Sequence, residues 1–380
     1  MKIGIDISQI VFQGTGVAQY TKKLVENLLR IDKENEYVFF GSSLRQKKRL
    51  DDYLANLAER KNVSVKTFPF PPLLLEFLWN KLHLLPIERL IGPVDVFHSS
   101  DWLQAPIRAK KVTTIHDLIV YKYPESFQQR GGHDVVANQK RRLGWVKKEG
   151  DLIIVDSEAT REDVIEVLKI PQERIHVVYL AADERFRPQP RSEINKVKRR
   201  YKIKGDYLLS VGTQEPRKNL KRVIQAYLTL KPDYPKLSLL VAGSSGWGEE
   251  IKSVNGVKLL GFVPDEDLPA LYSGAQCFVY PSLYEGFGLP VLEAMASGCP
   301  VVTSGVSSLP EVAGAAAVLV NPKSAEEIAE GIKKALKNCQ RLSEKGLTQA
   351  KRFTWERTAK ETLKVYREAA SFAYQEAVRC

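Results

Sequence analysis

The chain has 380 residues, of which 44% are hydrophobic and 27% charged, and its formal net charge is +12. This length exceeds one domain of ordinary size, and the composition is that of a globular protein, which excludes a disordered or low-complexity chain. The longest apolar runs fall short of the roughly 18 residues that a membrane-spanning helix needs, and the segment beginning at Met1 resembles a strand rather than a signal peptide.

Short runs of β-branched and other apolar residues alternate with helical patterns along the whole chain. In the first half, the predicted strands are Lys2–Ser8, Tyr37–Phe40, Val63–Phe68, Val94–His98, Val112–His116, Leu152–Asp156 and Ile175–Leu180. In the second half, they are Tyr207–Val211, Leu237–Ala242, Val257–Phe262, Cys277–Tyr280, Val301–Thr303 and Val318–Val320. This alternation predicts an α/β protein with two doubly wound, Rossmann-like parallel sheets.

The first glycine-rich loop is Gly14-Thr15-Gly16, between the first predicted strand and a predicted helix at Val17–Leu29. Glycines let a backbone approach a ligand closely, and a helix N-terminus offers amides to an anion. The spacing does not fit the dinucleotide fingerprint, because Gln19 follows where a third glycine is required. The loop is therefore either a ligand-binding turn or a structural one.

The segment 68–91 is apolar on most sides and interrupts the alternation of strands and helices. One interpretation is a helix packed on the sheet. The other is an interfacial element that contacts a bilayer or a lipid-linked acceptor, for which Trp79 and Lys81 are suitable residues. The sequence leaves both interpretations, and with them a peripheral membrane contact, open.

The domain boundary is predicted at Asp183–Pro190, a stretch with two prolines. The expected domains are 1–185, 186–353 and a terminal helix over 354–380. The boundary is followed by a basic run, Arg187 to Lys204, whose eight cations and one acid, Glu193, give a net charge of +7. A second basic cluster comprises Lys140, Arg141, Arg142, Lys147 and Lys148.

Neither basic cluster has interleaved aromatic residues or a recognisable nucleic-acid-binding motif, so we do not expect nucleic acid as a partner. Solvated helix faces, or attraction to anionic lipid or to a phosphorylated substrate, remain as interpretations. The four cysteines, Cys277, Cys299, Cys339 and Cys380, contain no C-x-x-C pair. They predict reduced thiols and a cytoplasmic protein, with a peripheral position at the inner face of the cytoplasmic membrane left open.

The second candidate loop, Val211–Leu220, follows a predicted strand and carries Arg217 and Lys218 where a helix is expected to begin. Cations at that end oppose the helix dipole, so they are better suited to binding a phosphate than to stabilising the helix.

The most specific segment is Tyr280–Pro300, in which Glu285 and Glu293 are separated by seven residues. Pro290 suits the first helical position, which predicts Glu285 in the preceding loop and Glu293 in the first turn. Backbone amides of 286–289 would then lie at a helix N-terminus with a carboxylate on either side. Carboxylates accept hydrogen bonds from sugar hydroxyls, and the amides suit phosphate oxygens.

At these residues the chain resembles the large retaining family known as glycosyltransferase family 4. The resemblance rests on the Glu-x7-Glu segment with its flanking Pro-Ser and Ala-x-Gly-x-Pro-Val-Val, and spans the chain. Other matching segments are the glycine loop, His116-Asp117, Asp156-Ser157-Glu158, the 211–220 loop, Gly261-Phe262-Val263 and Phe353-Thr354-Trp355. The resemblance implies the GT-B fold, in which two Rossmann-like domains face a central cleft and the terminal helix crosses back onto the first domain.

The resemblance also implies roles for individual residues. Gly14 and Gly16 would lie near the donor diphosphate or the acceptor, and Lys218 would bind the diphosphate. Glu285, with amides around Phe287, Gly288 and Leu289, would hold the transferred sugar, and Glu293 would bind the ribose hydroxyls. Val263 would contact the nucleotide base, and His116 would approach the sugar or acceptor.

One departure from the family pattern concerns the diphosphate. Many members carry an arginine directly after the glycine equivalent to Gly212, where this chain has Thr213. Either Arg217, beside Lys218, replaces that charge from the other end of the loop, or diphosphate binding depends on Lys218 and backbone amides. The sequence of residues 213–219 resembles that of bacterial mannosyl- and rhamnosyltransferases that make surface polysaccharides, which favours GDP-mannose as donor.

These residues predict a retaining hexosyltransferase acting on a nucleotide sugar, with a glycan or lipid-linked acceptor. Cations and amides at the leaving phosphate would stabilise its developing charge. The sequence offers no metal-ligand cluster, so we expect neither a metal nor a cofactor. Three alternatives remain: a sugar-nucleotide epimerase, a phosphorylase-like enzyme that would need pyridoxal phosphate, and a non-catalytic sugar- or nucleotide-binding protein.

Overall fold

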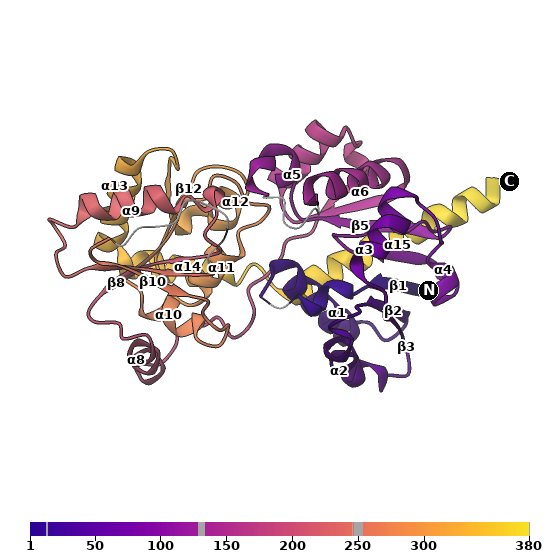
Figure 1. The fold of residues 1–380 in the computed structure, drawn as a ribbon, viewed down its shortest axis with the longest axis horizontal. Coiled ribbons are helices and arrows are strands. Elements are labelled where there is room, and N and C mark those ends of the chain that lie inside the picture. Colours follow the sequence, from indigo (N-terminus) through magenta and orange to yellow (C-terminus); the bar gives the residue numbers. More distant parts are fainter. Residues whose placement is uncertain (13, 128–133, 245, 247–253, 380) are drawn as a thin grey trace. The chain divides into compact units, whose positions relative to one another are not determined.

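The computed structural model describes residues 1–12, 14–127, 134–244, 246 and 254–379. It divides into two compact units (Figure 1). Unit 1 comprises Met1–Leu180 and Trp355–Cys380, and unit 2 comprises Ala181–Thr354. Each unit has its own parallel sheet covered by helices, which confirms the prediction of two doubly wound α/β domains.

Unit 1 contains a seven-stranded sheet in the order β3-β2-β1-β4-β5-β6-β7. Its strands are β1 Lys2–Asp6, β2 Glu36–Ser42, β3 Val63–Phe68, β4 Val96–Ser99, β5 Lys110–Ile115, β6 Leu152–Val155 and β7 Ile175–Val177. The chain builds outward from β1 through β2 to β3, and then returns to add β4 on the other side of β1. The strand order therefore reverses between β1 and β4.

Unit 2 contains a six-stranded sheet in the order β10-β9-β8-β11-β12-β13. Its strands are β8 Tyr207–Val211, β9 Ser238–Ala242, β10 Val257–Gly261, β11 Cys277–Tyr280, β12 Val301–Ser304 and β13 Val318–Val320. Here the order reverses between β8 and β11. Every segment predicted as a strand forms one, and each predicted bound lies within three residues of the observed one.

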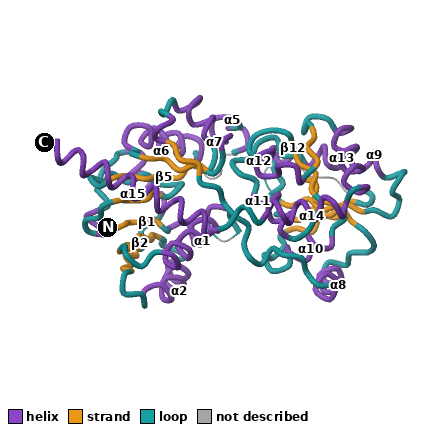
Figure 2. Tube along the Cα trace, turned by 180° about the vertical axis from the view of Figure 1, so that it is seen from behind, coloured by secondary structure: helices purple, strands orange, loops and turns teal. Residues whose placement is uncertain are grey.

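In unit 1, helices cover both faces of the sheet (Figures 1 and 2). They are α1 Gly16–Ile31, α2 Lys47–Ala58, α3 Pro72–Leu75, α4 Glu88–Ile91, α5 Ile119–Lys122, α6 Val135–Glu149, α7 Glu158–Asp163 and α15 Trp355–Arg379. Short 3-10 or π turns occur at Ser8–Val11, Glu76–Lys81, Pro124–Ser126, Val164–Leu168 and Gln172–Arg174. The terminal helix α15 packs along α1 and against β5. Its Tyr366 is fully buried there, and Thr358 Oγ1 donates a hydrogen bond to the Tyr179 carbonyl at 2.7 Å.

In unit 2, the helices are α8 Arg191–Arg200, α9 Leu220–Leu230, α10 Leu268–Gly274, α11 Leu289–Ala296, α12 Leu309–Ala313, α13 Ala325–Lys337 and α14 Cys339–Ala350. Two 3-10 turns lie at Pro216–Lys218 and Gly314–Ala316. Helices α9 and α13 pack together over one face, where Val223, Ile224 and Ile332 share a core with alternate residues of the strands. Helices α11 and α14 form a second packed pair, distinct from α9 and α13, and α10 packs against α11.

The apolar segment 68–91 packs on the unit 1 sheet. Leu75 and Trp79 are each 1% exposed and share a core with Phe40, and the Trp79 indole donates to the Leu85 carbonyl at 3.0 Å. The prediction of a packed helical segment is therefore confirmed. The suggestion that Trp79 sits at an interface is wrong, because its ring is inside the core.

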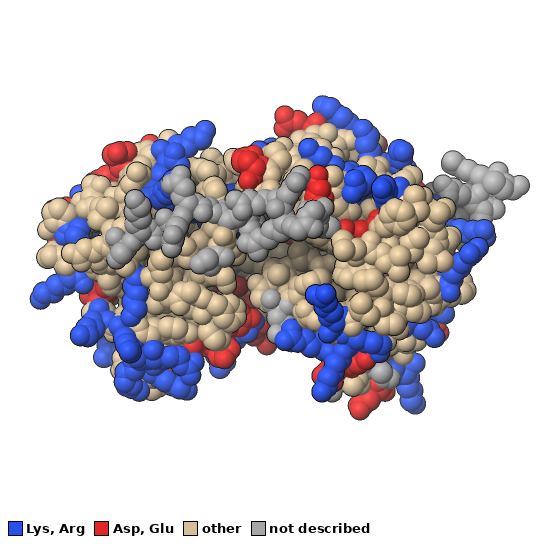
Figure 3. All heavy atoms as spheres, in the orientation of Figure 1, with Lys and Arg blue, Asp and Glu red and all other residues tan. Residues whose placement is uncertain are grey.

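The basic clusters differ in their exposure. On α8 only Val197 is buried, and the Lys and Arg side chains lie on the exposed face, where they gather over this helix in Figure 3. In α6, Arg142 is 1% exposed and donates to the Thr114 carbonyl, so it does not belong to a basic surface. Burial of one member was not predictable from charge alone.

No helix in the described part of the chain is both long and apolar enough to cross a bilayer. The thiols of Cys277 and Cys299 are buried, and that of Cys339 is exposed; all three are free. Cys380 lies outside the described residues.

A close approach between helix and sheet in unit 2 can be tested at Gly331 of α13. A Cβ at this position would lie 2.5 Å from Val320 Cγ1, so Gly331→Ala forces the helix away from β13. We expect a loss of about 1–3 kcal/mol of stability, measured by denaturant unfolding.

Gly144 of α6 is the matched control, because a Cβ there meets no described atom within 4 Å. Gly144→Ala should instead gain about 0.5–1 kcal/mol through helix propensity. Equal effects of the two substitutions would contradict this packing.

Candidate functional site

The first candidate site lies in unit 2, at the point where the strand order reverses. Strands β8 and β11 are parallel neighbours with Leu208 opposite Cys277 and Leu209 opposite Phe278. Their carboxyl ends therefore lie side by side, and the loops that follow them, 212–219 and 281–288, leave the sheet together. Ligands of doubly wound sheets bind at this kind of position.

The loop after β8 is fixed by Asn219. This residue adopts a left-handed conformation with φ of 62°, and its side-chain amide donates to the carbonyls of Pro281 at 2.9 Å and Pro322 at 2.6 Å. Asparagine tolerates this conformation better than most residues. Helix α9 consequently begins at Leu220, directly after Asn219 and the 3-10 turn that ends at Lys218, which agrees with the prediction of a helix that begins near Lys218.

The two predicted cations and one predicted carboxylate meet in a single network. Lys218 Nζ donates to Glu285 Oε1 at 2.7 Å and to the Tyr280 hydroxyl at 2.5 Å. Arg217 pairs with Glu285 Oε2 at 2.9 Å and with Glu215. Both carboxylate oxygens of Glu285 are thus held by cations, and Tyr280 donates a further bond to Oε1 at 2.8 Å.

The network keeps its members charged although they are buried. Burial acts to raise the pKa of Glu285, but the charges of Lys218 and Arg217 outweigh it and hold that pKa at about 2. Burial lowers the pKa of Lys218, and Glu285 opposes this. An ammonium group has three N–H donors, of which Tyr280 and Glu285 take two. The third can serve an oxygen of a ligand.

The loop after β11 leads into the amino end of α11. Gly288 has φ of 105°, and a Cβ there would lie 2.6 Å from Leu309, so a side chain is excluded. The hydroxyl of the fully buried Ser308 shares its one proton between the carbonyls of Glu285 at 2.9 Å and Phe287 at 2.8 Å. No described side chain caps α11. Its amino end, which begins at Leu289, therefore presents the positive end of the helix dipole beside Glu285.

Glu293 is the fifth residue of α11, one position beyond the first turn in which we predicted it. Its Oε2 accepts a hydrogen bond from the Tyr272 hydroxyl at 3.3 Å, and burial raises its pKa to about 7. Its charge is therefore sensitive to whatever binds beside it.

Val263 follows β10, which lies at the edge of the sheet, with β9 between it and β8. The side chain is buried at 5% exposure, whereas its neighbour Phe262 is 67% exposed. The structure thus does not bring Val263 into the Lys218–Glu285 network.

The remaining predicted site residues belong to unit 1, where they follow β1 and β5, on either side of β4. Gly14, with φ of 79°, leads into α1, which begins at Gly16 and is capped by Thr15. Residues Val17, Tyr20, Thr21 and Leu24 of this helix line a pocket at the carboxyl ends of β1, β4 and β5. Gly14 and Gly16 are at the start of this helix but do not line the pocket.

His116 lines the same pocket, directly after β5. Its Nδ1 lies 2.6 Å from Asp156 Oδ2, which is the first residue after β6. Burial lowers the pKa of His116, but Asp156 outweighs this effect and raises the pKa to about 9. The imidazole is therefore charged at neutral pH.

A second histidine of this pocket, His98 in β4, is held in the opposite charge state. Its Nδ1 is 2.7 Å from the Tyr366 hydroxyl and its Nε2 is 2.8 Å from the Thr114 hydroxyl, which lies 2.9 Å from the Tyr20 hydroxyl. Burial lowers the pKa of His98 to about 3. These bonds connect α15 to the pocket through neutral groups.

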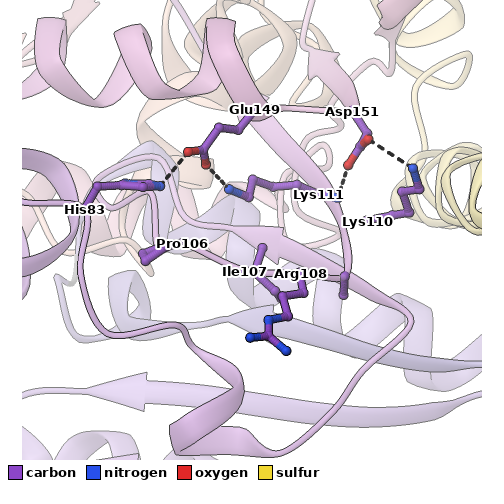
Figure 4. A pocket seen from close by; sticks show the side chains of 9 residues that line it. His83, Pro106, Ile107, Arg108, Lys110, Lys111, Glu149 and Asp151 are labelled. Atoms are coloured by element: carbon purple, nitrogen blue, oxygen red, sulfur yellow. Dashed lines mark hydrogen bonds and ion pairs between the residues drawn. The ribbon is translucent and has the colours of Figure 1, made fainter.

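A further pocket in unit 1, of about 250 Å³, lies at the amino ends of β5 and β6 (Figure 4). Glu149 pairs with His83 at 2.7 Å and with Lys111, and Asp151 pairs with Lys110 at 3.6 Å. These acids and cations largely neutralise one another. The pocket lies at the amino ends of the strands, whereas His116 lies at their carboxyl ends. It is therefore separate from the site at the strand-order reversal.

Tyr280 and Asp156 were not predicted as site residues. Each nevertheless had a signal, because Tyr280 ends a predicted central strand and Asp156 ends the predicted strand next to the one that ends at His116. In the described residues, no group of three or more His, Cys, Asp or Glu is arranged to hold a metal ion.

Comparisons with known proteins agree with this architecture. Residues 14–186 match the family described as "Glycosyltransferase Family 4", and residues 192–352 match "Glycosyl transferases group 1". The chain is 31% identical to the O-antigen chain mannosyltransferase B of Escherichia coli, over 97% of this chain and 100% of the relative. It is also 33% identical to the serotype-specific mannosyltransferase WbdA of Escherichia coli, over 66% of this chain but only 32% of that larger protein.

Solved structures show the same fold. The Anabaena protein HepE, in complex with UDP and glucose, superposes with a TM-score of 0.69 at 18% identity, covering 97% of this chain and 100% of that one. WaaG, a glycosyltransferase involved in lipopolysaccharide biosynthesis, gives a TM-score of 0.65 at 14% identity, covering 98% and 99%. The chain therefore belongs to the group 1 glycosyltransferases of glycosyltransferase family 4, and its two parallel-sheet domains are those of the GT-B fold.

Proposed function

We propose that this glycosyltransferase moves a mannosyl residue from GDP-mannose to a hydroxyl of a glycan or lipid-linked acceptor, with retention of the anomeric configuration. The observation that carries the proposal is the Lys218–Glu285–Arg217 network beside the amino end of α11, at the strand reversal of unit 2. This site combines the cations of Lys218 and Arg217, the amides at the amino end of α11 and the Glu285 carboxylate. These are the groups that a diphosphate joined to a sugar requires.

The network supports a division of labour between its charges. The free N–H of Lys218 and the amino end of α11 suit the diphosphate, which gains negative charge as the sugar leaves. Glu285 is better suited to accept hydrogen bonds from sugar hydroxyls than to act as a nucleophile, because two cations already neutralise it. Transfer with retention would then proceed by attack of the acceptor hydroxyl on the anomeric carbon, from the same face that the phosphate leaves. No metal is required in this scheme.

The choice of mannose rests on the relatives. This chain is 31% identical to an Escherichia coli protein named as an O-antigen chain mannosyltransferase, and 33% identical to one named as a serotype-specific mannosyltransferase. HepE, which was solved with UDP and glucose, is only 18% identical, so it supports the fold rather than a UDP donor. An O-antigen-like surface polysaccharide is accordingly the favoured acceptor class. An epimerase or a non-catalytic binding protein would release no nucleotide in response to an acceptor.

The donor assignment is tested by calorimetric titration of GDP, UDP, GDP-mannose and UDP-glucose without added metal. We expect GDP compounds to bind, and Lys218→Ala to weaken GDP binding about 10- to 100-fold, through loss of one charge-assisted hydrogen bond. Lys221→Ala is the matched control, because it removes an exposed lysine from α9. Folded wild-type protein that binds neither nucleotide would refute the proposal.

The charge of Glu293 should make donor binding depend on pH. Ribose hydroxyls donate hydrogen bonds, so they favour the ionised carboxylate and lower the pKa of Glu293 from its free value of about 7. GDP-mannose affinity should therefore be full above that pKa and fall about tenfold between about pH 8 and about pH 6. Calorimetry at several pH values measures this, and Glu293→Gln should remove the pH dependence. The same slope in the variant would place the ribose elsewhere.

We also propose that unit 1 binds the surface of an anionic membrane, where a lipid-linked acceptor would be held. Five large apolar side chains between residues 73 and 84 are exposed: Leu73, Leu74, Phe77, Leu82 and Leu84. Exposed Lys81 lies over the Phe77 ring at 5.5 Å, and exposed Arg108 lines the pocket next to His83. Apolar side chains flanked by cations suit the interface of a bilayer with negative headgroups.

The membrane proposal is tested by sedimentation with phosphatidylglycerol-containing and pure phosphatidylcholine vesicles. Leu73→Glu with Leu84→Glu should reduce binding to the anionic vesicles more than tenfold, since each leucine loses about 1.5–3 kcal/mol of burial. Leu259→Glu in β10, which replaces a leucine that is 42% exposed, is the control. Equal binding of wild type to both vesicle types, or an equal loss in the control, would contradict this surface.

A further inference from the structure

The pairing of His116 with Asp156 follows from the sheet itself. Strands β5 and β6 are parallel neighbours in which Ile115 is opposite Val155, so the next residues, His116 and Asp156, leave the sheet side by side. Asp156 is 3% exposed and His116 is 13% exposed at the side chain. The bond between Nδ1 and Oδ2 therefore forms in a nearly water-free place, where a hydrogen bond to a charged group is strong.

The other ring nitrogen has a different environment. His116 Nε2 is buried and has no hydrogen-bond partner among the described residues, although the ring lines the pocket at the carboxyl ends of β1, β4 and β5. The edge-to-face contact with Tyr20, at 4.7 Å between ring centres, fixes the plane of the ring. A buried N–H without a partner is unfavourable, and an oxygen bound in the pocket would supply the missing acceptor.

We propose that Asp156 is the positioning residue of His116, holding its ring in one orientation and keeping it doubly protonated. His116 then offers its Nε2–H to the substrate as a cationic donor and does not act as a general base. The identity of the substrate rests on the proposed function, and the ligand atom is an oxygen of a hydroxyl or phosphate group. A doubly protonated imidazole has no lone pair to accept a proton, so deprotonation of the acceptor falls to another group.

The charged groups around the ring favour this state. Those that act on His116 or contact it are Asp156 after β6, Asp117 after β5, Asp101 after β4, His98 in β4 and Tyr20 in α1. Arg142 in α6 pairs with Asp101. Of the acids, Asp156 has the largest effect on the pKa of His116. His98 has hydroxyl partners only and remains neutral, so two histidines of one pocket differ because one has a carboxylate and the other does not.

The proposal is tested first without substrate, by NMR titration of the ring signals of the five histidines. His116 should titrate with a midpoint near its pKa of about 9 in the wild type. In Asp156→Asn the midpoint should fall to about 7 or lower, because the main opposite charge is gone. Asp156→Glu should restore a raised midpoint, and Asp163→Asn, which removes another buried carboxylate of unit 1, should leave it unchanged.

The second measurement is the pH profile of transfer. With GDP-mannose saturating at every pH, which removes the effect of Glu293 on donor affinity, the wild-type rate should be flat from about pH 6 to about pH 8. The rate of Asp156→Asn should instead fall as pH rises through the lowered pKa of His116. A merely structural role for Asp156 would lower the rate equally at every pH. An ordinary midpoint for His116 in the wild type, or an unchanged one in Asp156→Asn, overturns the proposal even if that variant folds poorly. Normal titration with no transfer would instead overturn the proposed function and leave the His116–Asp156 pair standing.

Discussion

The parallel direction of the strands is the constraint on which both candidate sites depend. In a parallel sheet every carboxyl end lies at one edge. Where the strand order reverses, the loops of two neighbouring strands begin side by side and their onward connections run to opposite sides, which leaves a crevice for a ligand. In unit 2 this place is between β8 and β11, and in unit 1 it is between β1 and β4. Lys218 and Glu285 are distant in sequence and lie in loops. They meet there because the strands that precede these loops, β8 and β11, are neighbours in the sheet.

Buried charges at these edges are stable only as matched sets. Glu285 has a pKa of about 2 although it is buried, because Lys218 and Arg217 hold both its oxygens. Replacing one member of such a set leaves another charge uncompensated, at a cost of about 3–5 kcal/mol. The network is therefore arranged before a ligand arrives, and its spare donor capacity lies on Lys218. The same principle in unit 1 gives His116 a charge that its neighbour His98 lacks.

The loops of the unit 2 site are held by side chains that bond to backbone carbonyls, most of them outside the charged network. Asn219 bonds to carbonyls that follow β11 and β13, and Ser308, after β12, bonds to two carbonyls of the loop that carries Glu285. Gly288 has no room for a side chain next to Leu309. These fixed positions allow the carboxylate and the amino end of α11 to keep their places without cost at the moment of reaction.

The sequence by itself determined the strands, their assignment to two sheets, and the segment that carries Glu285 and Glu293, because β-branched runs and Gly-Pro punctuation are local signals. It did not determine which charges pair. That Glu285 binds Lys218 and Arg217, that Asp156 binds His116, and that Arg142 and Trp79 are buried depend on strand order and register. The start of α9 at Leu220 was likewise decided by the contacts of Asn219 with distant carbonyls. Such pairings are set by tertiary structure, since burial strengthens interactions between groups that local sequence does not bring together.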